Sequence, residues 1–187
     1  MVHLKINNIP VEVPEGSTIL EAAKAVGINI PTLCYLKDIN EIGACRICVC
    51  EVKGARSLVT ACVYPVSEGM EVFTNTEKVR KSRKTTLELL LSNHKKECLS
   101  CVRSTNCELQ KLSNEYGCDE NRFQGEKTKY EEDTSTGYLV RDNEKCILCR
   151  RCVAVCKSVQ QVAVIAPARR GFNTHIACAF DSDLSEA

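Results

Sequence analysis

Short runs in which apolar and polar residues alternate fill roughly the first 75 positions, a pattern typical of strands that bury one face. The runs that predict strands are residues 3–6, 11–13, 48–52, 58–60 and 70–73. The Asn7-Asn8 pair between the first two runs favours a tight hairpin turn. Two hairpins and a closing strand predict a small, half-open sheet.

Three segments have the periodicity of amphipathic helices. Residues 18–26 form the first, which we expect to pack across the sheet with Ser17 as its N-cap. The other two are residues 77–94 and 108–116. The longer of them begins with a basic run, residues 78–84, which we interpret as a solvated helix face, with docking of a partner subunit as the alternative.

Fourteen cysteines are present among 187 residues, and the formal net charge is +1. The N-terminus has no apolar stretch of the kind found in export signals, and no run approaches the ~18–20 apolar residues that span a bilayer. We therefore expect a cytoplasmic chain with no membrane partner, in which reduced thiols bind metal instead of forming disulfides. The absence of a basic excess argues against nucleic acid as a partner.

The first cysteine group has the spacing of a [2Fe–2S] site. Its members are Cys34, Cys45, Cys48 and Cys62. Such a core needs four thiolates, two per iron, and a C-x10-C-x2-C loop with one distant partner can wrap it. Structural zinc is the alternative, although zinc sites with four cysteines normally use two short C-x2-4-C pairs and only one is present. We expect Cys50 to be a buried thiol outside the ligand set.

The second group combines a histidine with three cysteines in the pattern H-x3-C-x2-C-x5-C. Its members are His94, Cys98, Cys101 and Cys107. Three thiolates and one neutral imidazole can ligate the four irons of a [4Fe–4S] cluster, and the imidazole should raise its reduction potential. The same four side chains also form a common zinc ligand set, so the spacing alone leaves both metals open.

The third group, CILCRRCVAVC, has the C-x2-C-x2-C-x3-C spacing of bacterial ferredoxins. In that pattern Cys146, Cys149 and Cys152 share one [4Fe–4S] cluster, while Cys156 ligates a second one. The chain has no second run of this kind, and Cys178 is the only cysteine downstream. We therefore expect this ferredoxin-type cluster to be completed by residues outside the chain.

These residues resemble the N-terminal iron–sulfur region of [FeFe]-hydrogenases, a family shared with the large iron–sulfur subunit of complex I and with NAD-linked formate dehydrogenases. The resemblance rests on IPTLCYL, IGACRICVCEV and TACVYPVSEGMEVFTNT, then LLLSNHKKECLSCVRSTNCELQKL, then CILCRRCVAVCKSVQ and RRGFNTHIACAFD. It implies iron at all three groups, with His94 as a cluster ligand. Arg150 departs from the family, which usually has glycine at that place.

The resemblance also implies an α+β chain with four parts. These are a β-grasp [2Fe–2S] domain over 1–76, a small helical [4Fe–4S] segment over 77–118, a linker over 119–137, and part of a bacterial ferredoxin-like domain over 138–187. In the family a second ferredoxin run follows, so we expect an N-terminal portion of a longer subunit. A stand-alone relay completed by a partner is the alternative.

The implied function is an electron relay in a cytoplasmic [FeFe]-hydrogenase, NAD(P)-linked or electron-bifurcating. Its redox partners would be a subunit that binds flavin or NAD(P), or a ferredoxin. The same relay in a formate dehydrogenase or complex I-like subunit is one alternative, and a zinc-stapled interaction module is another. We expect no catalytic site within the chain, since no nucleophile constellation or P-loop is found in it.

Overall fold

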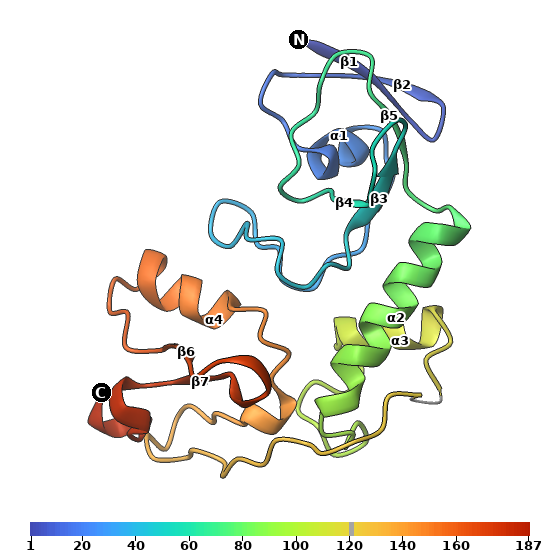
Figure 1. Cartoon of the computed structure of the whole chain (residues 1–187). Coiled ribbons are helices and arrows are strands. Elements are labelled where there is room, and N and C mark those ends of the chain that lie inside the picture. Colours follow the sequence, from blue (N-terminus) through green and yellow to red (C-terminus); the bar gives the residue numbers. More distant parts are fainter. Residues whose placement is uncertain (120–121) are drawn as a thin grey trace. The chain divides into compact units, whose positions relative to one another are not determined.

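The computed structural model describes residues 1–119 and 122–187, which divide into two compact units (Figure 1). The first unit is made of Met1–Tyr35, Glu41–Leu87 and Glu108–Asp119. The second is made of Leu36–Asn40, Glu88–Cys107 and the described residues of 120–187. No helix of the described chain is long and apolar enough to cross a bilayer.

A five-stranded mixed sheet organises the first unit. Its strands are β1 (Val2–Ile6), β2 (Ile9–Val13), β3 (Val49–Val52), β4 (Val59–Thr60) and β5 (Glu71–Phe73), in the order β2-β1-β5-β3-β4. The predicted hairpins, β1–β2 and β3–β4, are both antiparallel. Strand β5 lies between them, parallel to β1 and antiparallel to β3. Asn7 and Asn8 have φ values of 51° and 69°, which a two-residue hairpin turn of this hand requires.

Helix α1 (Ile19–Ala25) packs on this sheet through Ile19, Ala22 and Ala23, which are buried in the same apolar cluster as the strands. The predicted N-cap was wrong by one residue, because Thr18 caps the helix instead of Ser17. The Thr18 hydroxyl accepts from the Glu21 amide at 3.3 Å, and the Glu21 carboxylate accepts from the Thr18 amide at 2.9 Å. This reciprocal pair satisfies two amides that a helix start otherwise leaves unbonded.

The longest helix, α2 (Glu77–Asn93), contributes residues to both units, and α3 (Glu108–Glu115) belongs to the first. The expectation of a solvated basic face on α2 is wrong at Arg83, which is only 3% exposed. Arg83 lies four residues from both Val79 and Leu87, which are fully buried, so all three share one face of the helix.

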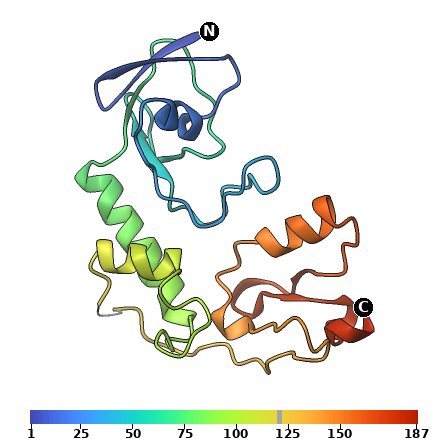
Figure 2. The ribbon, with the colours of Figure 1, turned by 180° about the vertical axis from the view of Figure 1, so that it is seen from behind.

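The second unit has little regular structure. Helix α4 (Arg151–Ala154) continues into a wider π turn at Val155–Val159, and β6 (Ala166–Ala168) pairs with β7 (His175–Ala177) in an antiparallel hairpin. Short 3-10 turns cover Asn143–Lys145, Gly171–Asn173, Ala179–Asp181 and Leu184–Glu186. In Figure 2 the C-terminal residues lie beside the extended segment 126–135, where the Leu184 amide donates to the Asp133 carboxylate at 3.0 Å.

Candidate metal centres

The four thiols of the first group are gathered inside the first unit. All of them are buried, with exposed fractions between 0% for Cys34 and 7% for Cys45. Three belong to the loop that leads into β3, and Cys62 follows β4, so the β3–β4 hairpin sets the distance between the last two. The fold therefore brings together residues that are far apart in the sequence.

The thiols interact as two pairs. The hydrogen bond with Cys34 lowers the pKa of Cys45 to about 5, and the same bond raises the pKa of Cys34. A hydrogen bond from Cys62 likewise lowers the pKa of Cys48 and raises that of Cys62. The sulfur of Cys62 also feels the charges of Cys34 and Cys45, so the two pairs are neighbours. Two adjacent pairs of thiols match the two-per-iron ligand demand of a [2Fe–2S] core.

Backbone donors and a glycine complete this loop. The Cys45 amide donates to the Cys34 sulfur at 3.5 Å. Gly43 has a φ of +60°, and a Cβ there would lie 3.2 Å from a Val63 methyl carbon. A larger residue would therefore be strained and crowded where the chain turns toward Cys45.

Cys50 lies beside this group, in the same apolar cluster as Cys48 and Cys62. Its side chain is fully buried in the apolar cluster of the sheet, as the sequence predicted. Burial raises the pKa of Cys50 to about 12, so this sulfur stays a neutral thiol. It donates weakly to the carbonyl of Cys48 at 3.7 Å.

In the second group, His94 follows the last residue of α2 and its Nδ1 atom is buried without a hydrogen-bond partner. Burial lowers the pKa of His94, while the nearby Asp142 opposes this and Lys145 adds to it. The imidazole is therefore neutral at neutral pH, the form that binds metals. An unpartnered, buried ring nitrogen fits a metal ligand better than it fits an ordinary core histidine.

The three cysteines of this group are less enclosed. Cys98 is exposed, whereas Cys101 and Cys107 are half-buried. The Cys101 sulfur accepts from the Arg103 amide at 3.5 Å, and its charge acts on Lys145. Across the described residues, no three His, Cys, Asp or Glu side chains are close enough to hold a single metal ion. The ligand sets therefore remain predictions.

The third group wraps around the start of α4. Burial raises the pKa values of Cys146 and Cys152, and each of these sulfurs also feels the charge of Cys149. The Leu148 amide donates to the Cys146 sulfur at 3.4 Å, which needs the left-handed φ of 54° at Leu148. Cys156 lies on the π turn, and its charge acts on Cys152.

Arg150 also has a left-handed φ, +60°, immediately before α4. Glycine adopts this conformation without the cost of about 1–2 kcal/mol that a Cβ imposes. The local backbone at the position of Arg150 is therefore one that glycine would adopt with less strain.

Ion pairs join the second and third groups within the second unit. Lys95 contacts Glu97 at 3.4 Å and Glu144 at 3.5 Å, while Lys145 contacts Glu97 at 3.7 Å and Asp142 at 3.2 Å. These five residues flank His94 on one side and Cys146 on the other. The network holds two candidate ligand segments against each other.

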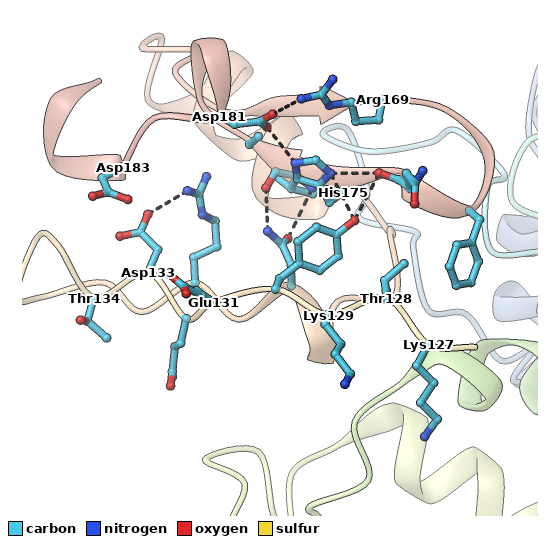
Figure 3. Close-up of a pocket in the computed structure, with 18 of the residues that line it drawn as sticks. Lys127, Thr128, Lys129, Glu131, Asp133, Thr134, Arg169, His175, Asp181 and Asp183 are labelled. Carbon is cyan, nitrogen blue, oxygen red and sulfur yellow. Dashed lines mark hydrogen bonds and ion pairs between the residues drawn. The ribbon is translucent and has the colours of Figure 1, made fainter. Parts of the chain in front are cut away.

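A pocket of about 1250 Å³ is also found in the second unit, between the extended segment and the β6–β7 hairpin (Figure 3). None of the predicted ligands lines it. Some of its charged groups form ion pairs with one another: Asp181 lies 2.8 Å from both Arg169 and the His175 Nε2, and Asp133 lies 2.8 Å from Arg141.

Two family descriptions match the chain. Residues 1–77 match a 2Fe-2S iron-sulfur cluster binding domain, and residues 83–122 match the NADH-ubiquinone oxidoreductase-G iron-sulfur binding region. The first range contains all four members of the first cysteine group, and the second contains His94 and its three cysteines.

The chain is similar over nearly its whole length to two longer proteins. The chain is 44% identical to the NADP-reducing hydrogenase subunit HndD of Solidesulfovibrio fructosivorans, over 100% of its length and 33% of that relative's. It is 39% identical to the NADH-ubiquinone oxidoreductase 75 kDa subunit of Reclinomonas americana, over 99% of its length and 27% of that relative's. It thus spans about a third or less of these relatives.

A solved structure is similar to nearly the whole chain. It is the crystal structure of an NAD+-reducing [NiFe]-hydrogenase in the H2-reduced state, and the alignment covers 95% of this chain and 75% of the hydrogenase chain, with a TM-score of 0.88 and 28% sequence identity. The chain therefore carries a 2Fe-2S iron-sulfur cluster binding domain followed by an NADH-ubiquinone oxidoreductase-G iron-sulfur binding region, and nearly its whole length is similar to subunits of an NADP-reducing hydrogenase and of NADH-ubiquinone oxidoreductase.

Proposed function

We propose that the chain is the electron relay of an NAD(P)-linked hydrogenase of the [FeFe] class. The observation that carries the relay function is the assembly of four buried thiols into two adjacent pairs within the 2Fe-2S domain. When bound, iron–sulfur clusters accept and release single electrons, and the protein tunes their potentials through ligands, hydrogen bonds and burial.

The first site would hold its cluster with Cys34 and Cys45 on one iron and Cys48 and Cys62 on the other. This assignment follows the two hydrogen-bonded pairs. The pKa of Cys45, lowered to about 5, makes this sulfur a thiolate that can bind a soft iron centre, and the lowered pKa of Cys48 favours ionisation in the second pair. Burial of all four sulfurs would exclude water from the bound cluster.

The second site would use the neutral imidazole of His94 with Cys98, Cys101 and Cys107. A neutral ligand in place of a thiolate leaves one negative charge fewer around the cluster, which favours its reduced state. The third site would use Cys146, Cys149 and Cys152, with Cys156 directed to a further cluster. The proposed parts are the [2Fe–2S] domain 1–76, the helical segment 77–118, the linker 119–137 and the ferredoxin-like portion 138–187.

The choice of a hydrogenase rests on the 44% identity to the NADP-reducing hydrogenase subunit across the whole chain. The assignment to the [FeFe] class rests on the amino-acid sequence of the third group, CILCRRCVAVCKSVQ, and of the later segment RRGFNTHIACAFD. The 39% identity to the 75 kDa subunit supports a complex I-like relay as the second candidate. In either case the partners would be subunits that exchange electrons with NAD(P) or flavin, or a ferredoxin.

Iron and acid-labile sulfide analysis of the anaerobically purified chain tests the relay function. The first two sites account for about six irons per chain, and up to about four more would come from the third. Stoichiometric zinc without sulfide would contradict the proposal. Electron transfer from a reduced hydrogenase partner, compared with transfer from an NADH dehydrogenase partner, separates the two candidate complexes.

A further inference from the structure

Arg83 is a buried cation behind the first candidate site. Its side chain is 3% exposed, on the face of α2 that also buries Val79 and Leu87. The Nη2 atom donates to the carbonyl of Val49 at 2.8 Å, and Nη1 donates to the Tyr116 hydroxyl at 3.0 Å. The Nε atom is buried without a hydrogen-bond partner.

The residues that Arg83 contacts connect it to the first group of thiols. Val49 directly follows Cys48, so the guanidinium is bound to the strand that begins at a candidate ligand. Arg83 also acts on the sulfur of Cys50, which donates to the carbonyl of Cys48. The positive charge therefore lies against the strand that follows Cys48, in the buried interior of the first unit.

The partners of Arg83, which are a carbonyl, a phenol and the Cys50 thiol, are all neutral. Among the described residues, no carboxylate lies within ion-pair distance of Arg83, whereas the buried carboxylate of Glu88 is paired with Arg122 at 2.7 Å. An ionised side chain removed from water is costly unless an opposite charge compensates it. Arginine cannot avoid this cost by losing its proton.

We propose that Arg83 is the buried counter-charge of the first site and raises the reduction potential of the cluster held there. A [2Fe–2S] core with four thiolates carries a net charge of about −2 when oxidised and about −3 when reduced. A fixed cation nearby stabilises the reduced form more, because its attraction grows with the negative charge. This inference rests on the proposed function of the first site.

The alternative is that Arg83 only joins α2 to β3 and α3 by hydrogen bonds. The two roles differ in what they require of the side chain. A counter-charge role needs the positive charge, which lysine keeps. A purely structural role needs the fork of donors that reaches Val49 and Tyr116 together, which lysine lacks.

The test is a redox titration of the [2Fe–2S] signal by EPR in the full, cluster-loaded chain. Arg83→Gln and Arg83→Met remove the charge, and Arg83→Lys keeps it. Tyr116→Phe removes one hydrogen bond without changing the charge. Lys84→Met removes an exposed charge from the neighbouring position of α2, where water screens it.

We expect the neutral variants to have about a tenfold smaller ratio of reduced to oxidised cluster at a fixed potential, a shift of ~59 mV to lower potential. Arg83→Lys, Tyr116→Phe and Lys84→Met should stay near the wild-type potential. Unchanged potentials in the neutral variants, or equal shifts in Arg83→Lys and Arg83→Met, would overturn the proposal.

If neither neutral variant binds a cluster at the first site, but Arg83→Lys binds one with the wild-type potential, then the site requires the positive charge. This result supports the proposal. Failure of Arg83→Lys to load as well overturns it in favour of a packing role. A wild-type chain without any [2Fe–2S] signal would instead refute the proposed function of the site.

Discussion

Lys95 and Glu144 are joined twice. The Lys95 amide donates to the Glu144 carbonyl at 2.9 Å, and the Lys95 ammonium lies 3.5 Å from the Glu144 carboxylate. Lys95 directly follows His94, and Glu144 stands two residues before Cys146. The second and third ligand segments are thus held together by backbone and charge at the same point.

The charged half of this link should contribute little and depend on salt. The side chains of Lys95 and Glu144 are 40% and 23% exposed, so water and salt screen the pair. We expect Glu144→Gln to lower the free energy of unfolding slightly in about 10 mM salt and to have no effect in about 1 M salt. Urea unfolding of the loaded chain measures both, with Glu131→Gln as an exposed control.

Substitution of Cys45 and of Cys50 should have opposite consequences for the first site. Cys45 is paired with Cys34 and has a pKa lowered to about 5, whereas Cys50 is a neutral thiol in the apolar cluster. Cys45→Ser should abolish the [2Fe–2S] absorption and EPR signals. Cys50→Ala should keep both and lose about 1 kcal/mol of stability through the small cavity. A folded Cys50→Ala protein without the signal would place Cys50 among the ligands.

His94→Cys should keep its cluster at a lower potential. A thiolate brings a negative charge that the neutral imidazole lacks, so the oxidised state is favoured. Each ~59 mV changes the partition of one electron tenfold. A redox titration monitored by EPR measures the shift, and His3→Gln, at an exposed histidine of the β1 strand, is the control. If every cluster titrates as in the wild type, His94 is not a ligand.

We expect the Asp133 carboxylate to hold the C-terminal residues in place over a wide pH range through its hydrogen bond with the Leu184 amide. Hydrogen bonds from the Ser135 hydroxyl and amide lower its pKa from 3.8 to about 2, with help from the Leu184 amide and Arg141. The carboxylate therefore contributes its full stability above about pH 4 and loses it only as the pH falls through about 2. Asp133→Ala should accelerate hydrogen exchange at Leu184 at neutral pH, whereas Glu132→Ala, at an exposed neighbour, should not.

Much of the fold was predictable because its signals are local. The Asn7-Asn8 turn, both hairpins, β5 and the long helix follow from residue types within a few positions of one another. The N-cap was misplaced because Ser17 and Thr18 are both good caps by residue type. Only Thr18 has a glutamate three residues later, Glu21, and this capping-box spacing could have decided between them.

The candidate sites were predictable as groups but not as geometry. Spacing names Cys34, Cys45, Cys48 and Cys62, yet their pairing depends on how the loop returns to the β3–β4 hairpin, which is a property of tertiary structure. Arg83 was missed because a basic run hides it, although its four-residue distance from Val79 was available in the sequence. The backbone strain at Arg150 could not be derived without dihedral angles.

The difference in thiol exposure bears on how the protein acquires its iron. A donor protein that hands over a preassembled cluster must reach a sulfur, and Cys98 is exposed in the folded chain. The four sulfurs of the first group are sealed beneath their own loop. Under the proposed ligand assignment, delivery of a cluster to the first group would have to precede closure of the loop or wait for the loop to reopen.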